Sequence, residues 1–176
     1  MAGSYRQVVK AKSVSVRYNE PPKSYMSWNN DICLDVVIEK QSKDGESYDY
    51  TFIISGNFKK DNPKNQWGSA FKVAKFFEAV GVNTKNIGSD MVIPDGWFDQ
   101  AIGKEFSYIT YPSDRVRDDG KPFWNDFDIV MSAAAGQDAH KAEFDKQVTD
   151  GWIKVFQEPT EEPSADSSDV DDDMDL

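Results

Sequence analysis

Apolar and polar residues alternate along three stretches in the first third of the chain. Alternation with a period of two is typical of a β-strand with one buried face. It predicts strands over residues 6–18, 32–40 and 48–58. Whether the first of these strands is interrupted stays open. An Asp44-Gly45 pair lies between the second and third stretches, and Asp-Gly between two such runs is typical of a hairpin turn.

The pattern changes to that of a helix over residues 68–80. Four apolar residues there stand at i, i+3, i+4 and i+7, which makes one stripe along a helix: Val73, Phe76, Phe77 and Val80. Gly81 follows the stripe directly and is placed to end the helix.

The pattern is weaker in the second half of the chain. It predicts a helical segment over 94–102, strands over 105–111 and 123–131, a charged loop between these strands, and a helix over 138–148; no element is assigned to 83–95. In the fifth strand, Phe127, Ile129 and Met131 are expected to face the core. Trp152, Val155 and Phe156 follow the last helix, and their apolar character predicts that this segment packs back on the body.

Three strands, a helix and two further strands follow one another in the order of the OB-fold, a partly open five-stranded barrel that commonly binds oligonucleotides. The fold class expected is therefore mainly β with helices (α+β), an OB-fold-like barrel with one helix between strands three and four and another after strand five. Ferredoxin-like and other α+β arrangements use similar elements, although they normally place a helix after the first strand.

Charge divides the chain into two parts. The net charge is −11, but nine acidic and no basic residues lie in 158–176, so that residues 1–157 carry 22 acidic and 20 basic residues, a net of −2. The acidic part is also rich in Ser and Pro and almost without apolar residues, so it cannot bury enough surface to offset the entropy of ordering. We expect one folded domain over 1–156 and a disordered acidic tail over 157–176.

Composition narrows the class of protein further. A chain of 176 residues with 39% hydrophobic residues can bury a core of its own. No apolar run is long enough to span a membrane, the first residues lack a secretory signal, and the single cysteine, Cys33, cannot form an internal disulfide. We expect a cytoplasmic protein without membrane contact.

Residue types that carry catalysis are scarce. The one histidine, His140, is expected at the surface of a polar helix, and with one cysteine it cannot complete a zinc site. The chain has no phosphate-binding loop and no nucleophile elbow, and its acidic run lacks the Gly and distal Glu of a calcium loop. The sequence thus predicts no enzyme, no catalytic residue, no metal and no cofactor.

Binding of a single strand without sequence preference requires cations for the phosphates and flat aromatic faces for the bases. The chain interleaves the two in three clusters: Arg17, Tyr18, Lys23, Tyr25 and Trp28; Lys59, Lys60, Lys64 and Trp67; Tyr108, Tyr111, Arg115, Arg117, Lys121 and Trp124. The first and third clusters flank the loops that OB-folds commonly use for binding. Other interpretations stay open. The aromatics of the first cluster can pack over the barrel end, the lysines can form a solvated loop, and the last helix can cover Trp124.

Four stretches resemble a phage family long known only as a domain of unknown function, whose members look like OB-fold single-stranded DNA-binding proteins. They are DICLDVVIEKQSKDGESYDYTFIIS, GSAFKVAKFFEAVGV, IGKEFSYITYPS and GKPFWNDFDIV, about two thirds of the chain. The last residues, DSSDVDDDMDL, are similar to the tails of bacterial and phage single-stranded DNA-binding proteins, with Met174-Asp175-Leu176 where those usually carry a terminal Phe.

The resemblance implies a sequence-nonspecific single-stranded DNA-binding protein that acts in phage DNA replication, recombination or repair in the host cytoplasm and can form homo-oligomers. The tail is expected to compete with DNA for the groove. It is also expected to recruit phage or host replication and recombination proteins through Asp169, Asp171, Asp172, Asp173, Met174, Asp175 and Leu176. Two rival functions remain: an acidic DNA mimic that inhibits a host DNA-binding enzyme, and a replication adaptor that never touches DNA.

Overall fold

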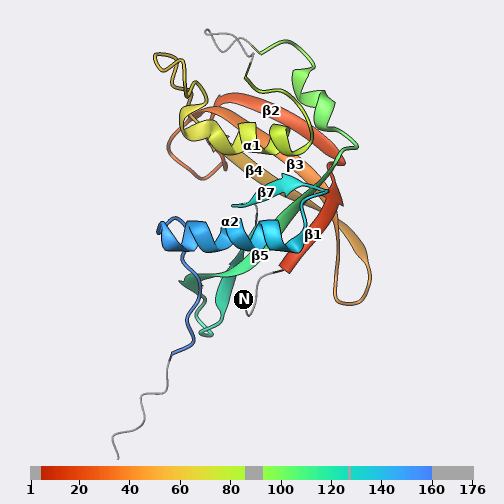
Figure 1. Cartoon of the computed structure of the whole chain (residues 1–176), viewed down its shortest axis with the longest axis vertical. Helices are drawn as coiled ribbons and strands as arrows, with labels where there is room; N and C mark the ends of the chain where they lie inside the picture. Colours follow the sequence, from red (N-terminus) through yellow and green to blue (C-terminus); the bar gives the residue numbers. More distant parts are fainter. Residues whose placement is uncertain (1–4, 86–92, 127, 160–176) are drawn as a thin grey trace, which may run out of the picture.

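The computed structural model describes residues 5–85, 93–126 and 128–159 and arranges them as two β-sheets with two α-helices (Figure 1). The protein is therefore mainly β with helices, as predicted. The residues expected to form the tail tip, Asp169 to Leu176, and Phe127 of the predicted fifth strand lie outside the described residues. Among the described helices, none is both long and apolar enough to cross a membrane.

The first sheet is antiparallel and contains β2 (Ser13–Glu20), β3 (Asn30–Gln41) and β4 (Ser47–Gly56) in that order. The alternation seen in the sequence places Val14, Ile32 and Leu34 among the side chains that are buried on one face. Gly45 has a φ of 81° in the predicted turn between β3 and β4, and its amide donates to the Ser42 carbonyl over 3.0 Å. The predicted hairpin is thus confirmed.

The second sheet is built around β5 (Glu105–Val116). β1 (Tyr5–Lys10) pairs with one edge of β5, and β7 (Val130–Ser132) pairs with the other edge of the same stretch, at Phe106–Tyr108. β6 (Pro122–Asn125) pairs with β5 further along, between Tyr111 and Val116, and all three pairings are antiparallel. β5 is a central strand, so residues on both of its faces are buried: Phe106, Ser107, Tyr108 and Ile109 each expose 3% or less of their surface.

The predicted first strand contributes to both sheets. It is interrupted between β1 and β2, where the Ala11 amide donates to the Lys104 carbonyl beside β5 and the Lys12 amide donates to the Val37 carbonyl of β3. One continuous stretch of chain therefore links the sheets along one side.

On the opposite side the sheets do not meet. Within the described residues, no hydrogen-bonded ladder joins β4 to β6 or β7, so the seven strands do not close into a barrel, and the predicted five-stranded barrel is not confirmed. The reason lies in α1 (Phe71–Ala79), which packs against both β4 and β7 and fills the space where a closing ladder would run.

The predicted fifth strand, 123–131, is not continuous. It is divided into β6 and β7, and two carboxylates that lie between them bind side chains of other elements. Asp126 accepts hydrogen bonds from Thr110 and from the Lys40 ammonium at 3.1 Å, and Asp128 accepts from Tyr111 and from Lys72 at 2.8 Å. Of the residues expected to face the core, Ile129 is buried and Met131 is half-buried.

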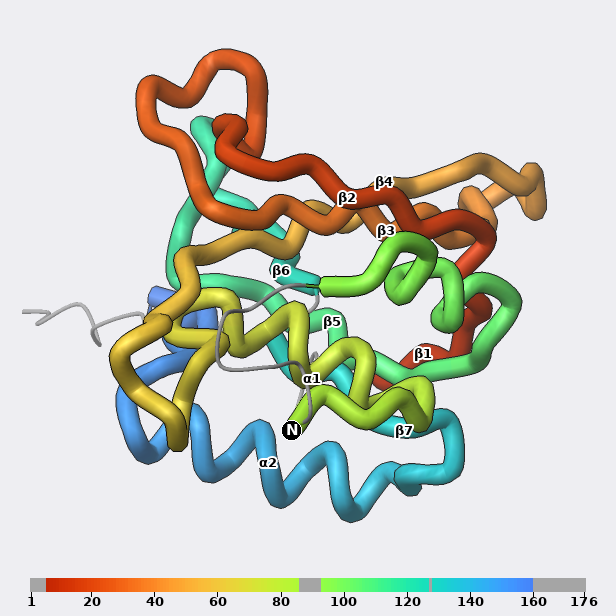
Figure 2. Tube along the Cα trace, turned by 90° about the horizontal axis from the view of Figure 1, so that it is seen from above, coloured from red at the N-terminus to blue at the C-terminus, as the bar shows by residue number. Residues whose placement is uncertain are grey.

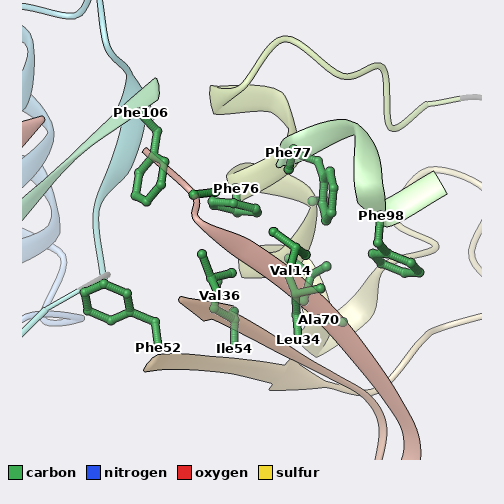
Figure 3. Close-up of a cluster of buried hydrophobic side chains, with 14 of the residues drawn as sticks. Val14, Leu34, Val36, Phe52, Ile54, Ala70, Phe76, Phe77, Phe98 and Phe106 are labelled. Atoms are coloured by element: carbon green, nitrogen blue, oxygen red, sulfur yellow. The ribbon is translucent and has the colours of Figure 1, made fainter. Parts of the chain in front are cut away.

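The main core lies between the first sheet, α1 and β5 (Figure 3). The helix predicted over 68–80 is confirmed: a 3₁₀ turn at Gly68–Ala70 leads into α1, and the predicted stripe is its buried face. Aromatic rings connect the layers, with Phe76 of α1 5.2 Å from Phe106 and Phe52 of β4 5.3 Å from Tyr108, measured between ring centroids. A second 3₁₀ segment, Trp97–Ala101, covers the core where a helical piece was expected.

The predicted last helix is α2 (Gln137–Thr149), which packs on the second sheet and forms a smaller core there. Its Phe144 ring lies 5.5 Å from the ring of Tyr111. The chain then runs back along β5, where Val155 pairs with Ser113. The expectation for Trp152 was wrong, because its side chain remains 82% exposed.

Gly56 is the closest backbone approach in the fold, at the end of β4. A Cβ atom there would lie 2.4 Å from the backbone nitrogen of Ala70 and the carbonyl carbon of Ser69, and backbone atoms of this turn cannot swing aside as a side chain can. The 3₁₀ turn that starts α1 therefore depends on glycine at position 56.

We expect Gly56→Ala to lower the free energy of unfolding by at least the ~1–3 kcal/mol typical of overpacking a well-packed site. Urea denaturation monitored by tryptophan fluorescence would measure the change. Gly136→Ala is the matched control, because a Cβ there meets no atom within 4 Å and the φ of −78° suits any residue. Equal stability of the two variants would contradict this account of the turn.

Candidate nucleic-acid interface

The loop between β2 and β3, residues 21–29, presents aromatic side chains to solvent; we call it the aromatic loop. Tyr25 is 77% and Trp28 54% exposed, and Lys23 holds its ammonium 6.0 Å from the Tyr25 ring centroid. Tyr18, at the end of β2, is 46% exposed and packs one edge against Phe98. These side chains do not pack over a barrel end, so their faces are available to a ligand.

Arg17 organises this loop and is not an available cation. Its guanidinium donates to both carboxylate oxygens of Asp35, at 2.8 and 3.1 Å, and to the carbonyls of Pro21 and Pro22, each at 3.0 Å. A further ion pair joins it to Glu20 at 3.4 Å. Hydrogen bonding to Asp35 raises the pKa of Arg17 further above its usual range. The expected phosphate contact is therefore corrected: Arg17 fixes the base of the loop instead.

The second cluster divides into exposed lysines and a buried tryptophan. Lys59, Lys60 and Lys64 are exposed in residues 57–67, the lysine loop, and none of them forms an ion pair within the described ranges. Backbone hydrogen bonds shape the loop, including one from the Lys59 amide to the Gln66 carbonyl over 2.8 Å. Trp67 is only 8% exposed and donates its indole N–H to the Thr84 carbonyl, so it belongs to the core and does not offer a stacking face.

In the third cluster, the two tyrosines are also core residues. Tyr108 and Tyr111 are 0% and 3% exposed, and their hydroxyls donate to Gln7 and Asp128 respectively. Burial raises the pKa of both tyrosines. Neither ring can stack on a base in this structure, which corrects the expectation for both.

The rest of the third cluster lies on the β5–β6 hairpin, residues 112–125, and is exposed. Trp124 is 48% exposed, so α2 does not cover it, and Phe123 beside it is 49% exposed. Arg115 sits 5.9 Å from the Phe123 ring, and Arg117 contacts Asp119 loosely at 3.8 Å. Lys121, near the tip, is exposed as well. The hairpin thus combines cations with two aromatic faces.

The three segments lie at the same end of the molecule. The aromatic loop, the lysine loop and the β5–β6 hairpin are all toward the left of Figures 1 and 2, whereas the β3–β4 hairpin lies on the right. Within this end they are spread out: the lysine loop is at the top and the β5–β6 hairpin at the bottom of the folded part in Figure 1, and the lysine loop and the aromatic loop lie at opposite edges in Figure 2. The exposed members of the three predicted clusters therefore share one end of the fold without forming a single cluster: Tyr18, Lys23, Tyr25, Trp28, Lys59, Lys60, Lys64, Arg115, Arg117, Lys121 and Trp124.

Two further exposed aromatics on this side were missed from the sequence: Phe71, 45% exposed, and Trp152. A signal for Phe71 was present. It precedes Val73 by two positions and so lies off the buried stripe of α1, on a helix face that an apolar residue does not normally occupy. Trp152 carried no such signal, because it follows the helix in a segment without periodicity.

A buried Ser107–His140 pair resembles a catalytic dyad but lies out of reach of a substrate. Both residues are 0% exposed, and His140 Nε2 lies 2.7 Å from Ser107 Oγ. The expected surface position of His140 is thus wrong, because α2 turns this residue onto β5. The Ser107 hydroxyl also lies 2.9 Å from the Ser132 carbonyl, so it is placed between that carbonyl and the imidazole. His140 Nδ1 has no hydrogen-bond partner in the described part of the chain.

No group of three or more His, Cys, Asp or Glu side chains in the described residues is arranged to hold a metal ion. Comparison of the chain with protein-family models, with curated proteins and with solved structures gave no match. The likeness to the phage family therefore rests on the sequence pattern alone.

The His140 environment makes stability depend on pH. Burial, and then the nearby Arg6 guanidinium, lower the pKa of His140. Below the ordinary histidine pKa of about 6.5, the unfolded chain binds a proton that the folded protein resists. The stabilisation is therefore complete above about pH 6.5 and is lost as the pH falls toward the lower pKa of the folded state.

We expect unfolding free energies measured between about pH 7 and pH 5 to fall more steeply for the natural chain than for His140→Gln, by at most about 1.4 kcal/mol per pH unit. Carboxylates titrate in both proteins and cancel in the comparison, and His140 is the only histidine. Parallel curves would contradict a buried neutral imidazole.

Proposed function

We propose that this protein binds single-stranded DNA without sequence preference and serves DNA replication, recombination or repair. The observation that carries the proposal is that three separate loops at one end of the fold expose aromatic faces and lysines. Stacking on aromatics and contact with cations are the two interactions that sequence-tolerant binding uses.

The fold supports this proposal as an open relative of the OB barrel. A first strand shared by both sheets and a helix between the third and fourth predicted strands are consistent with that architecture, which binds oligonucleotides through loops at one side. In the proposed assignment, the aromatic loop and the β5–β6 hairpin correspond to those loops. That the two open sheets form an OB-like fold is itself part of the proposal.

Each loop contributes a different interaction in the proposed complex. Tyr25 and Trp28 offer stacking faces on a loop whose base Arg17 has already fixed, so little ordering entropy is lost on binding. Lys59, Lys60 and Lys64 supply ammonium groups that no described carboxylate neutralises. Trp124 and Arg115 extend the surface along the β5–β6 hairpin.

The acidic segment, residues 158–176, acts in the proposal as a tethered competitor for these cations. The chain leading to it is fixed beside β5, where the Phe156 amide donates to the Pro112 carbonyl over 3.0 Å. Residues 160–176, if extended, span roughly 55–60 Å at about 3.3–3.6 Å per residue, so the segment can reach all three loops. When DNA displaces it, Met174 and Leu176 become available to a partner replication or recombination protein.

Fluorescence anisotropy with labelled oligo-dT at low salt tests the proposal. We expect binding by the natural chain, and losses of about tenfold or more for Tyr25→Ala and Trp28→Ala, because each stacked base contributes about 1–3 kcal/mol. Tyr48→Ala is the matched control: Tyr48 is similarly exposed, at 45%, but lies next to the β3–β4 hairpin on the other side. Absence of binding at low salt, even without the acidic segment, would refute the proposal and favour an adaptor or a DNA mimic.

Deletion of residues 165–176 tests the competitor. We expect tighter binding of oligo-dT at low salt, because six carboxylates no longer compete with the phosphates. The gain should shrink as salt is added, since both interactions are screened. Replacing the deleted aspartates by asparagines in the full-length chain is the control for length. An affinity unchanged by either variant at low salt would show that the segment does not occupy the interface.

A further inference from the structure

A groove separates the start of α1 from the end of α2 and is not part of the three clusters. Its volume is about 360 Å³, and Phe71 and Trp152 stand on its walls together with Lys72, Lys75 and Lys146. In Figure 1 the first turn of α1 and the last turn of α2 lie one above the other on the left, the side that carries the three loops.

The fold fixes the backbone of Trp152 and leaves its side chain exposed. Two consecutive amides, those of Trp152 and Ile153, donate to the Gln147 carbonyl at 2.9 and 3.2 Å, and the Ile153 side chain is buried in the smaller core. The indole is 82% exposed. A large uncovered aromatic ring on a fixed stretch of backbone offers a surface on which a planar ligand can stack.

Phe71 provides a second aromatic surface, and a lysine ammonium lies beside it. The Lys75 ammonium lies 5.5 Å from the Phe71 ring centroid. Neither Lys75 nor Lys146 forms an ion pair with a described residue, whereas Lys72 is bound to Asp128 at 2.8 Å. Two lysines therefore remain available to an anionic ligand.

The carboxylates of the groove are partly engaged. Glu143 accepts a hydrogen bond from the side-chain amide of Gln147 at 2.9 Å, and Asp128 is paired with Lys72. Asp150 forms no ion pair with a described residue, and three lysines and three carboxylates line the groove itself. A second hollow adjoins the groove and shares Phe71 and Lys75 with it. The two hollows together are lined by more lysines than carboxylates. The lysines are Lys64, Lys72, Lys75, Lys85 and Lys146, and the carboxylates are Glu78, Asp128, Glu143 and Asp150.

We propose that this groove is a second nucleotide subsite, in which a base stacks on Trp152 or Phe71 while Lys75 and Lys146 contact the neighbouring phosphates. The inference rests on the proposed function and extends it. Because the adjoining hollow contains Lys64 of the lysine loop, a strand that leaves the three loops can continue along α1 into the groove. A bound strand would then occupy two regions, and only a long strand would reach both.

Strand length separates this subsite from the primary interface. We expect Trp152→Ala to weaken binding of an oligo-dT of about 30 nucleotides by about tenfold, and to leave one of about 8 nucleotides within twofold, because a short strand fits on the loops alone. Trp152→Phe should restore most of the loss. Lys146→Ala should lower the salt dependence of long-strand binding by about one phosphate contact, a slope change of ~0.7.

Control variants distinguish the possible failures. Trp28→Ala should weaken both strand lengths and Tyr48→Ala neither. If the natural chain binds no strand, the proposed function itself fails. If it binds both strands and Trp152→Ala binds them as well, the subsite is refuted. Equal weakening of both lengths would place Trp152 in the primary contact, and tighter binding of both would show that the groove holds the acidic segment; either result overturns the proposal.

Discussion

Two lysine–aspartate pairs bridge the open side of the fold, where no hydrogen-bonded ladder joins the sheets. Asp126 and Asp128 each accept a hydrogen bond from a hydroxyl group of β5. Asp126 also binds the Lys40 ammonium of β3, and Asp128 binds the Lys72 ammonium of α1. Lys40 also lies 4.0 Å from the Tyr50 ring, so its charge is embedded among aromatics. The Lys40 and Asp126 side chains are only 16% and 11% exposed, and removing one partner of a buried pair typically costs about 3–5 kcal/mol because the other charge is left without compensation. The Lys72–Asp128 pair is 43% and 25% exposed, so solvent screens it and its contribution is smaller. Of the two pairs, Lys40–Asp126 therefore contributes more to holding the sheets together.

The same carboxylates adjoin the proposed interface. Asp126 and Asp128 lie between β6 and β7 and bind Lys40 and Lys72. β6 pairs with the far end of β5, and the β5–β6 hairpin carries Trp124 in an exposed position. On the other sheet, the Arg17 guanidinium binds Asp35 and two loop carbonyls. Arg17, which the sequence suggested for DNA contact, thus positions the aromatic loop instead.

Periodicity predicted most elements of the fold and fewer of its surfaces. The alternation in β3 and the stripe on α1 each identified a buried face correctly, because those elements have one face in the core. The same reasoning failed for Tyr108 and Tyr111. They lie on a central strand that the first sheet and α2 cover from opposite sides, so neither face reaches solvent. The predictions for Trp67 and His140 were wrong for a related reason: local sequence does not reveal which loop or helix face a distant element will cover.

Cations that are paired with carboxylates hold the fold together, whereas unpaired cations belong to the proposed interface. Arg17, Lys40 and Lys72 are held by carboxylates, and a phosphate could recruit them only by breaking those pairs. Lys59, Lys60, Lys64, Lys75 and Lys146 have no such partner in the described residues. Lys64 and Lys75 line one hollow with the exposed Phe71, and Lys75 and Lys146 line the adjoining groove with Phe71 and Trp152. A body with a net charge near zero can therefore present a locally cationic surface, and the acidity of the whole chain, which resides mainly in 158–176, does not argue against binding to DNA.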